Sequence, residues 1–519
     1  MNTKDVILQM PLRADKWEEK QLIQSFVNVG SLIPSLKGTN NQILYGRRGT
    51  GKTHVFSYLK STIEKENDDC CIFVDLRTLG STGSIYSDSM IPTEQRAIRL
   101  FIDLIQEIRN QIIQYITRDD EKKELFLSDV TPFLDVLLSY LNNKQINGTI
   151  KIESSNESEN KKDKSSSFSL SESPSFSLTS TTGEAEKHQF NVIEEGTQIY
   201  HFDNNAIFQI FKSVLEKIYP KKIWLFIDEF AELSTDLQIL LSDMIRRLFC
   251  PQKGFIIKIA AIEHRSEFKR QIDSRNYMGI ELGADFSSYN LDDFMVFGNN
   301  QTQSLSFFRD LLIRHINSML PDQDQYKNSE VLIRDIFTQE HAFEELVLAA
   351  EGVPRDAFNI LAKAITSDYY NKISVSGIRK AAKNWYNEDK LSSVTSYPEA
   401  QKLLTWIIDN VIGERHARAF LLRNDIEYEL INYLYDARIL HIIKQNISSR
   451  DTPGMKYNVY SIDYGCYVEL LNTSQAPLGL FEELSDDGSS EYCEVPKEDY
   501  RSIRRAILDM EEFNRVQNN

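Results

Sequence analysis

Residues 46–53 read GRRGTGKT and match the pattern G-x-x-x-x-G-K-[ST] at every fixed position. A strand-like run, NQILY, precedes them, and a segment with helical spacing, THVFSYLKSTIEKE, follows. In that order the glycines let successive N–H groups curl around a phosphate, and the helix start adds its positive dipole end. The pattern therefore predicts a phosphate-binding loop between a strand and a helix, which requires a parallel α/β sheet.

Each position of this loop has an expected role, with ATP and Mg²⁺ as the ligands. Lys52 is expected to reach the β- and γ-phosphates, and the Thr53 hydroxyl to ligate Mg²⁺. The residues expected to bind the nucleotide are Gly46, Arg47, Arg48, Gly49, Thr50, Gly51, Lys52 and Thr53.

A second motif, KKIWLFIDEFAELS, supplies the acids that such a loop needs. Ile223 to Ile227 form a continuous apolar run, as expected for a parallel strand covered on both faces. Asp228 at the carboxyl end is positioned to hold the Mg²⁺ shell. Glu229 beside it is expected to polarise the attacking water, which favours hydrolysis over mere nucleotide retention.

Bulk composition narrows the class of protein. The chain has 519 residues, enough for two or three domains, with 41% apolar and 26% charged residues. We find no apolar run of membrane-spanning length, no signal peptide and no cysteine pair at zinc spacing, so a cytoplasmic protein with reduced thiols is expected. A net charge of −17 argues against non-specific nucleic-acid coating and leaves only a local basic patch for such contacts.

Segment patterns predict five parts. Serine dominates residues 152–188, which cannot bury a core and are expected to be disordered or an exposed loop. The expected parts are a helical lead-in (1–30), a nucleotide-binding core (31–288) with a helical and Ser-rich insertion (about 92–200), a helical lid (289–390), a C-terminal domain (395–475) and an acidic tail, loosely attached (476–519).

The C-terminal domain is predicted from three helical and two strand-like stretches. The helices are expected over 399–412, 414–423 and 426–440, and the strands over 440–447 and 456–470. A polar turn, SSRDTPGM, separates the two strands. Three helices followed by a hairpin describe a winged helix-turn-helix.

The order of these features resembles that of AAA+ ATPases, most of all the branch that contains origin recognition complex subunits and archaeal initiator ATPases. Within the lid, EGVPRDAFNIL resembles that branch's G-x-x-R-x-A-x-x-x-L sensor-2 helix, which implies that Arg355 points at the γ-phosphate. The resemblance implies an α/β P-loop core with a helical lid and a winged helix, and an ATP-hydrolysing activity. IKIAAIEHRSEF and YSIDYGCYVEL are also similar to stretches of bacterial ATP-binding proteins, which adds no mechanism.

Two positions depart from the family pattern or stay open. The sensor-1 residue is usually a polar residue such as Asn, and here Glu263, His264 and Arg265 are alternatives. Arg246 and Arg247 lie where this class often places an arginine finger, which would make hydrolysis depend on a homo-oligomer. A basic helix end favoured by the macrodipole is the alternative for these two residues.

Two functions remain open from the sequence. One is a DNA-associated ATPase whose winged helix binds duplex DNA; the other is a nucleotide-dependent signalling switch that docks protein partners, as in bacterial antiviral defence. For DNA, the basic residues are Arg415, His416, Arg418, Arg423, Lys444, Arg450 and Lys456. Against it, the third helix carries Glu427, Glu429 and Asp436, which would face phosphates. Domain order slightly favours DNA.

Overall fold

The computed structural model describes residues 2–79, 88, 90–141, 144–154, 190–200, 203–295, 301–413, 419–426, 428–448, 454–470, 483–484, 490–491 and 507–517. The Ser-rich segment expected to be disordered lies outside these residues, except for its first three positions.

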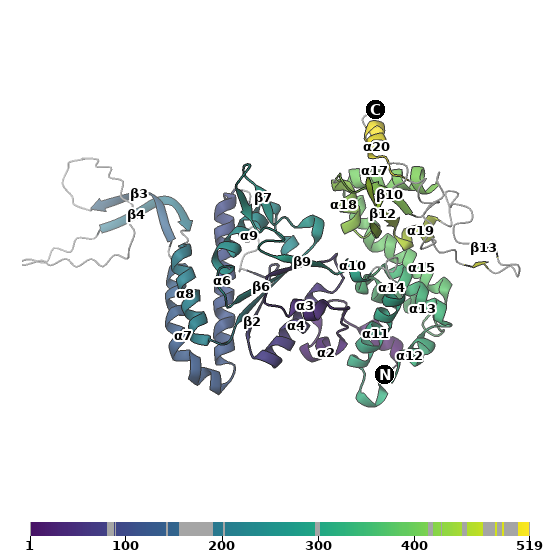
Figure 1. Cartoon of the computed structure of the whole chain (residues 1–519), viewed down its shortest axis with the longest axis horizontal. Helices are drawn as coiled ribbons and strands as arrows, with labels where there is room; N and C mark the ends of the chain where they lie inside the picture. Colours follow the sequence, from purple (N-terminus) through teal and green to yellow (C-terminus); the bar gives the residue numbers. More distant parts are fainter. Residues whose placement is uncertain are drawn as a thin grey trace, which may run out of the picture.

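A five-stranded parallel sheet forms the core (Figure 1). Its strands are β1 (Gln42–Tyr45), β2 (Cys70–Asp75), β5 (Ile223–Asp228), β6 (Phe255–Ala261) and β9 (Ser287–Asn290). They lie in the order β2-β5-β6-β1-β9, and every neighbouring pair is parallel. The carboxyl ends of β1 and β5, which carry the two sequence motifs, therefore open on the same edge with β6 between them.

Helices cover both faces of this sheet, which explains the apolar run in β5. Ile223, Leu225 and Ile227 face one cluster, while Trp224 and Phe226 face the other. The first cluster is covered by α6 (Thr93–Thr117), α8 (Asn204–Ile218) and α9 (Thr235–Phe249), and the second by α3 (Leu32–Leu36) and α4 (Lys52–Asn67). The prediction of a strand buried on both faces is confirmed.

The insertion between β2 and β5 is helical at its base. It contains α6, α7 (Asp120–Leu141) and α8, whose buried side chains join the core cluster of the sheet. Between α7 and α8 an antiparallel hairpin, β3 (Lys144–Ser154) and β4 (Phe190–Tyr200), extends away from the sheet (Figure 1). The remaining core elements are η2 (Phe230–Glu232), η3 (Glu263–Arg265), β7 (Lys269–Gln271), β8 (Tyr277–Gly279) and α10 (Asp292–Met295).

The helical lid has its own core, and the N-terminal segment is part of it. Val6 and Ile7 of α1 are buried against the lid helices, so the expected lead-in packs on the lid. The N-terminal elements are α1 (Thr3–Gln9), η1 (Ala14–Lys16) and α2 (Glu19–Ser25). The lid elements are α11 (Gln301–Met319), η4 (Asp322–Asp324), α12 (Ser329–Ile336), α13 (Glu340–Ala350), α14 (Pro354–Ser367) and α15 (Val375–Trp385).

The C-terminal domain follows a π-helical turn, η5 (Tyr386–Lys390), and α16 (Leu391–Thr395). It consists of α17 (Pro398–Trp406), η6 (Ile407–Gly413), β10 (Ala419–Arg423), α18 (Glu429–Asp436), β11 (Leu440–Ser448), β12 (Lys456–Ile462) and α19 (Tyr464–Leu470). The three strands form an antiparallel sheet in the order β10-β12-β11, so the predicted hairpin is confirmed.

The helix predicted over 414–423 is wrong, because its described part, residues 419–423, is strand β10. Alternate residues of β10 face two clusters, with Phe420 and Leu422 on one side and Leu421 on the other. Because alternate side chains are buried in two different apolar layers, the tertiary packing favours a strand over the local helix preference. The predicted helix-turn-helix needs two helices directly before the hairpin. Among the described residues, α18 is the one helix that lies between β10 and β11. The strand predicted over 456–470 ends at Ile462 and continues as α19.

The described residues 507–517 of the expected tail contact this domain, whereas the sequence suggested a loosely attached tail. The Leu508 amide donates to the Leu421 carbonyl, and Phe513 of α20 (Met510–Gln517) packs against Trp406. Two short strands, β13 (Glu483–Leu484) and β14 (Ser490–Glu491), pair with each other. Across the described residues no helix is long and apolar enough to cross a membrane.

Candidate nucleotide-binding site

The loop between β1 and α4 has the backbone that its glycines allow. Gly49 and Gly51 have φ angles of +88° and +96°, in the left-handed region that favours glycine. At Gly46, an added Cβ would lie 2.6 Å from the Thr50 hydroxyl oxygen. Glycine is therefore needed at Gly51 for its backbone conformation, at Gly46 for space and at Gly49 for both, and the resulting cradle fits a bound phosphate chain.

Lys52 lies at the start of α4 with its ammonium group inside the loop. Its Nζ donates to the Gly46 and Arg47 carbonyls at 2.7 and 3.1 Å. Burial lowers the pKa of Lys52, although the acids Asp228 and Glu229 oppose this shift. A phosphate anion at the same place would favour the charged lysine.

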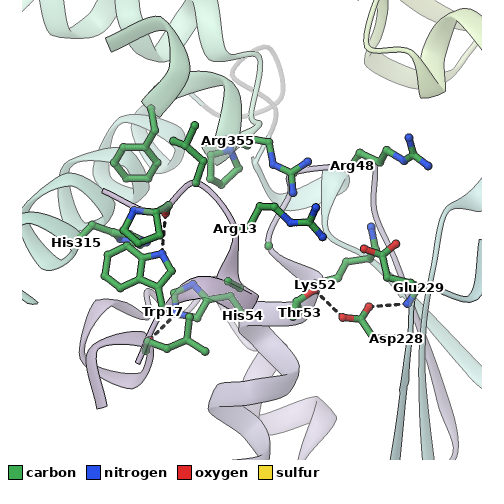
Figure 2. A pocket seen from close by; sticks show the side chains of 18 of the residues that line it. Arg13, Trp17, Arg48, Lys52, Thr53, His54, Asp228, Glu229, His315 and Arg355 are labelled. Carbon is green, nitrogen blue, oxygen red and sulfur yellow. Dashed lines mark hydrogen bonds between the residues drawn. The ribbon is translucent and has the colours of Figure 1, made fainter. Parts of the chain in front are cut away.

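Thr53 and Asp228 bring the two motifs together. The Thr53 hydroxyl donates to Asp228 Oδ2 at 2.6 Å, while Oδ1 accepts from the Glu229 amide at 2.8 Å (Figure 2). Burial raises the pKa of Asp228. A hydroxyl and a carboxylate side by side next to a phosphate cradle are the oxygen ligands that Mg²⁺ takes in such sites, so these residues fit the metal.

Glu229 directly follows the strand and has a left-handed backbone, with φ +57°. Such a conformation is uncommon for a residue other than glycine and concentrates at functional sites. Burial, followed by the nearby Asp228 charge, raises the pKa of Glu229. Its carboxylate lies 3.4 Å from the Arg77 guanidinium, which Asp75 in turn holds at 2.5 Å. The loop after β2 therefore orients the carboxylate expected to act on water.

The lid contributes Arg355 directly above the phosphate-binding loop. The Arg355 amide donates to the Gly49 carbonyl at 3.3 Å, and a Cβ on Gly49 would lie 2.8 Å from the Arg355 Cβ. Burial lowers the pKa of Arg355. The structure thus places the residue expected from the sensor-2 resemblance against the loop.

These groups line one cavity of about 370 Å³, which also has an aromatic side. Trp17, His54, His315 and Phe358 lie away from the acids, and the His315 ring is 5.3 Å from Trp17 and 5.0 Å from Phe358. Burial lowers the pKa of His315 to about 3, so this side is apolar and uncharged at neutral pH. Such a wall suits a flat heterocyclic base next to the phosphate cradle.

Sequence reasoning missed several members of this cavity. Arg13, from the N-terminal segment, projects toward the same space as Arg355 and Lys52 (Figure 2). Arg13, Trp17, Arg77 and His315 belong to no local motif, and they come from three segments far apart along the chain, with Arg13 and Trp17 in the same one. The nearest signal was the run PLRADKW at residues 11–17, which follows α1 and carries a cation and an aromatic ring.

The two loop arginines behave differently. Arg48 stays at the cavity rim, half exposed, and pairs with Glu232 at 2.5 Å. Arg47 is 1% exposed, and its side chain contacts Asp292 and the C-terminal domain. Only the backbone of Arg47 therefore belongs to the phosphate cradle.

None of the three sensor-1 alternatives lines the described cavity. Glu263 accepts from the Asn290 side chain at 2.9 Å, and His264 packs against Tyr435 of the C-terminal domain. Arg246 and Arg247 at the end of α9 both pair with Asp243, and Arg247 remains 60% exposed. Of the two, Arg247 is the one that a neighbouring subunit could reach.

The fold and the loop define a class, a parallel α/β core with a glycine-rich loop of P-loop sequence and a helical lid, which matches the AAA+ expectation. The family model ORC-CDC6-like matches residues 11–70, which include the phosphate-binding loop, Arg13 and Trp17. The chain therefore resembles ORC/Cdc6 proteins in this segment, as its motifs indicated. No curated protein matches the chain.

Two solved structures align with most of the chain. Cdc6p from Pyrobaculum aerophilum is 12% identical, with a TM-score of 0.29, and the alignment covers 88% of this chain and 93% of that one. The Aeropyrum pernix ORC1 protein, solved in complex with DNA, is 12% identical with a TM-score of 0.32, covering 90% and 96%.

Proposed function

We propose that this protein binds and hydrolyses ATP with Mg²⁺ and uses the nucleotide to change the arrangement of its domains. The observation that carries the proposal is the convergence of four parts on one cavity. They are the glycine cradle with Lys52, the Thr53–Asp228 pair, Glu229 and the lid residue Arg355. The parts come from three segments, residues 46–53, residues 228–229 and Arg355 of the lid, and together they match what phosphoryl transfer to water requires.

The residues divide the work. Lys52 and the loop amides bind the phosphates, while Thr53 and Asp228 would hold Mg²⁺, which would supply positive charge next to the phosphate oxygens. Glu229 orients and polarises the attacking water, since its raised pKa makes it a better proton acceptor than an ordinary glutamate. Arg355 contacts the terminal phosphate and transmits its presence to the lid.

The test compares nucleotide binding with turnover. Lys52→Ala is expected to abolish ATP binding measured by calorimetry, because the cradle loses its cation. Glu229→Gln is expected to retain binding and lower turnover by roughly 100-fold or more. Glu232→Gln, at the cavity rim, is the matched control. Turnover at the parent rate in Glu229→Gln would refute the catalytic assignment.

For the partner, we propose duplex DNA contacted through the hairpin of the C-terminal domain. Lys444 and Lys456 are exposed on β11 and β12, and Arg423 lies on the neighbouring strand. The relative solved with DNA is in line with this proposal. Arg415, His416, Arg418, Arg450 and Glu427 lie outside the described residues.

The DNA proposal is tested with ATP-loaded Glu229→Gln protein and duplex DNA over a salt series, with Lys52→Ala as the control. We expect ATP-dependent binding that weakens with salt. Replacing Lys444 and Lys456 with alanine should lower the slope of log K against log salt by about 2, because each phosphate contact contributes about 0.9.

A signalling switch that docks protein partners, as in antiviral defence, is the second proposal. The net charge of −17 and the helical insertion with its projecting hairpin favour a protein partner over a nucleic acid. Absence of DNA binding at low salt, with ATP binding intact, would favour this function. The search for its partner would then compare the full protein with a variant that lacks the insertion.

Assembly into a homo-oligomer is proposed with Arg247 as the finger for a neighbouring site. Arg247→Ala should then lower turnover most at protein concentrations where the oligomer forms. The control is Arg270→Ala, an exposed arginine paired with Asp236 at 2.9 Å. Unchanged turnover and unchanged concentration dependence in Arg247→Ala would refute the finger.

A further inference from the structure

The Arg47 side chain joins the phosphate-binding loop to the C-terminal domain. Asp292 accepts from both the Arg47 amide and its Nε, each at 2.8 Å. The guanidinium also reaches His441 Nδ1 at 2.8 Å and the Glu351 carbonyl at 3.4 Å, and lies 4.9 Å from the centre of the Tyr435 ring. One loop residue thus contacts the core, the lid and the C-terminal domain.

His441 lies between Arg47 and Asp463, and its two hydrogen bonds define the protonation state of its ring. Because Arg47 can only donate, Nδ1 of His441 accepts, and Nε2–H then donates to Asp463 Oδ2 at 3.2 Å. Burial lowers the pKa of His441, which agrees with a neutral ring. The arrangement is directional, from the loop through His441 to Asp463.

A buried chain of charges continues from Asp463 into the lid. Lys390 pairs with Asp463 and, at 3.1 Å, with Asp356 of α14. Arg438 pairs with Asp356 and Asp389. We call Arg47, Asp292, His441, Asp463, Lys390, Asp356 and Arg438 the interdomain network.

The network ends beside the lid arginine. Asp356 directly follows Arg355 at the start of α14, so its contacts with Lys390 and Arg438 also set where Arg355 can point. Within the described residues, Arg355 Nε is buried without a hydrogen-bond partner. The docked arrangement thus holds Arg355 in place but leaves part of its hydrogen-bonding capacity unused.

The same docking covers helix α18, the helix in the position expected for a recognition helix. It packs on η3 of the core, with the Tyr435 ring 5.5 Å from His264. The side of α18 that carries Tyr435 and Asp436 therefore faces the core. This surface becomes available only if the C-terminal domain separates from the core.

We infer that Arg47 is a positioning residue that couples the phosphate-binding loop to docking of the C-terminal domain, and that ATP at the loop weakens this docking. The inference rests on the proposed nucleotide function. Phosphates draw Lys52 off the Arg47 carbonyl and draw Arg355 toward the loop. Both movements disturb the network, through Arg47 at one end and Asp356 at the other. By linkage, loss of the Arg47 contacts should raise the affinity for ATP.

Hydrogen exchange over residues 429–436 and 263–265 of the full chain measures docking directly. In nucleotide-free protein, Arg47→Ala and His441→Phe are each expected to accelerate exchange in both segments by about tenfold or more, because each removes one partner of a buried polar pair. The matched control is Arg48→Ala, the neighbouring loop arginine that lies at the rim, which should leave exchange unchanged. Circular dichroism identifies a variant that fails to fold, and if Arg47→Ala fails, His441→Phe, outside the loop, carries the test.

Adding a non-hydrolysable ATP analogue to the parent protein should accelerate exchange in the same segments, and Arg47→Ala should bind the analogue more tightly than the parent does. Unchanged exchange in both network variants, or slower exchange with the analogue, would overturn the inference. If the parent fails to bind the analogue at all, the proposed function fails instead. The nucleotide-free exchange data would then still report whether Arg47 holds the C-terminal domain.

Discussion

The nucleotide cavity and the interdomain network are both dense in charge, yet they neutralise that charge differently. In the network, Asp356, Lys390 and Asp463 are at most 1% exposed, and each pairs with an opposite charge. In the cavity, Glu229 is 24% exposed and its cation lies 3.4 Å away. Complete internal pairing leaves the network no capacity for a ligand, whereas incomplete pairing leaves the cavity able to bind one.

The pKa directions express the same difference. Burial raises the pKa of Asp463, but Lys390 and His441 outweigh it and hold the net pKa below the usual range. At Glu229, burial and the Asp228 charge together raise the pKa, and Arg77 only partly opposes them. Counter-ions thus keep a buried carboxylate charged where they are built in, whereas burial with too few of them raises the pKa of a carboxyl group and poises it for proton transfer.

The largest expected effect is the loss of stability that follows when the interdomain network is disrupted. Asp463→Ala should lower the free energy of unfolding by about 3–5 kcal/mol, because Lys390 stays buried and keeps only Asp356 of its two acidic partners. Urea unfolding measures the change. The control is Asp425→Ala, an exposed acid paired with Arg423 in the same domain. A loss no larger than that of the control would show that the network does not hold the domains together.

In the cavity, removing a neighbouring charge should affect rate more than stability. Arg77→Ala is expected to lower kcat by roughly 10- to 100-fold with little change in KM for ATP, because Glu229 loses the cation that orients it. Arg77→Lys, which keeps the charge but not the fork with Asp75, should recover part of the rate. An equal rise in KM would mean that Arg77 binds nucleotide instead of positioning the carboxylate.

The aromatic side of the cavity predicts a pH dependence. His315 has its pKa lowered to about 3, so the unfolded chain binds a proton below pH 6.5 that the folded protein does not. Stability is therefore lost as pH falls, by roughly 1 kcal/mol between pH 6.5 and 5.5 from this residue. His315→Asn should show a shallower loss than the parent, and His341→Asn, on the surface, should match the parent. Parallel pH profiles would contradict the prediction.

The smallest effect is expected at the cavity rim. Arg48 and Glu232 pair at 2.5 Å but are 49% and 36% exposed. A double-mutant cycle with Arg48→Ala and Glu232→Ala should give a coupling below about 1 kcal/mol, since exposed pairs are screened by water. A coupling as large as that of a buried pair would break the contrast drawn between the two regions.

Residues that lie at fixed offsets from strand ends could be predicted. Asp228 ends β5 and Glu229 follows it, while Lys52 and Thr53 come after the loop that follows β1, and parallel strands bring those ends to one edge. Arg13 could not be predicted, because it reaches the cavity from the N-terminal segment, whose place against the lid no local pattern gives. Arg77 lies two residues after β2 at the same edge, but it belongs to no motif that would single it out. The helix predicted over 414–423 was wrong because β10 is shaped by the two apolar layers that it separates.

By itself the sequence determined the phosphate-binding loop, the buried strand with its terminal acids and the α/β class, because these depend on local backbone rules and on apolar runs. Only the tertiary structure decided that Arg47 turns away from the cavity while Arg48 stays at its rim. Both are arginines of one loop and look alike in the sequence. Their difference depends on Asp292, which is 245 positions away from Arg47, and on His441, which is 394 away. Long-range neutralisation of charge is a property of the packed domains, and no local pattern encodes it.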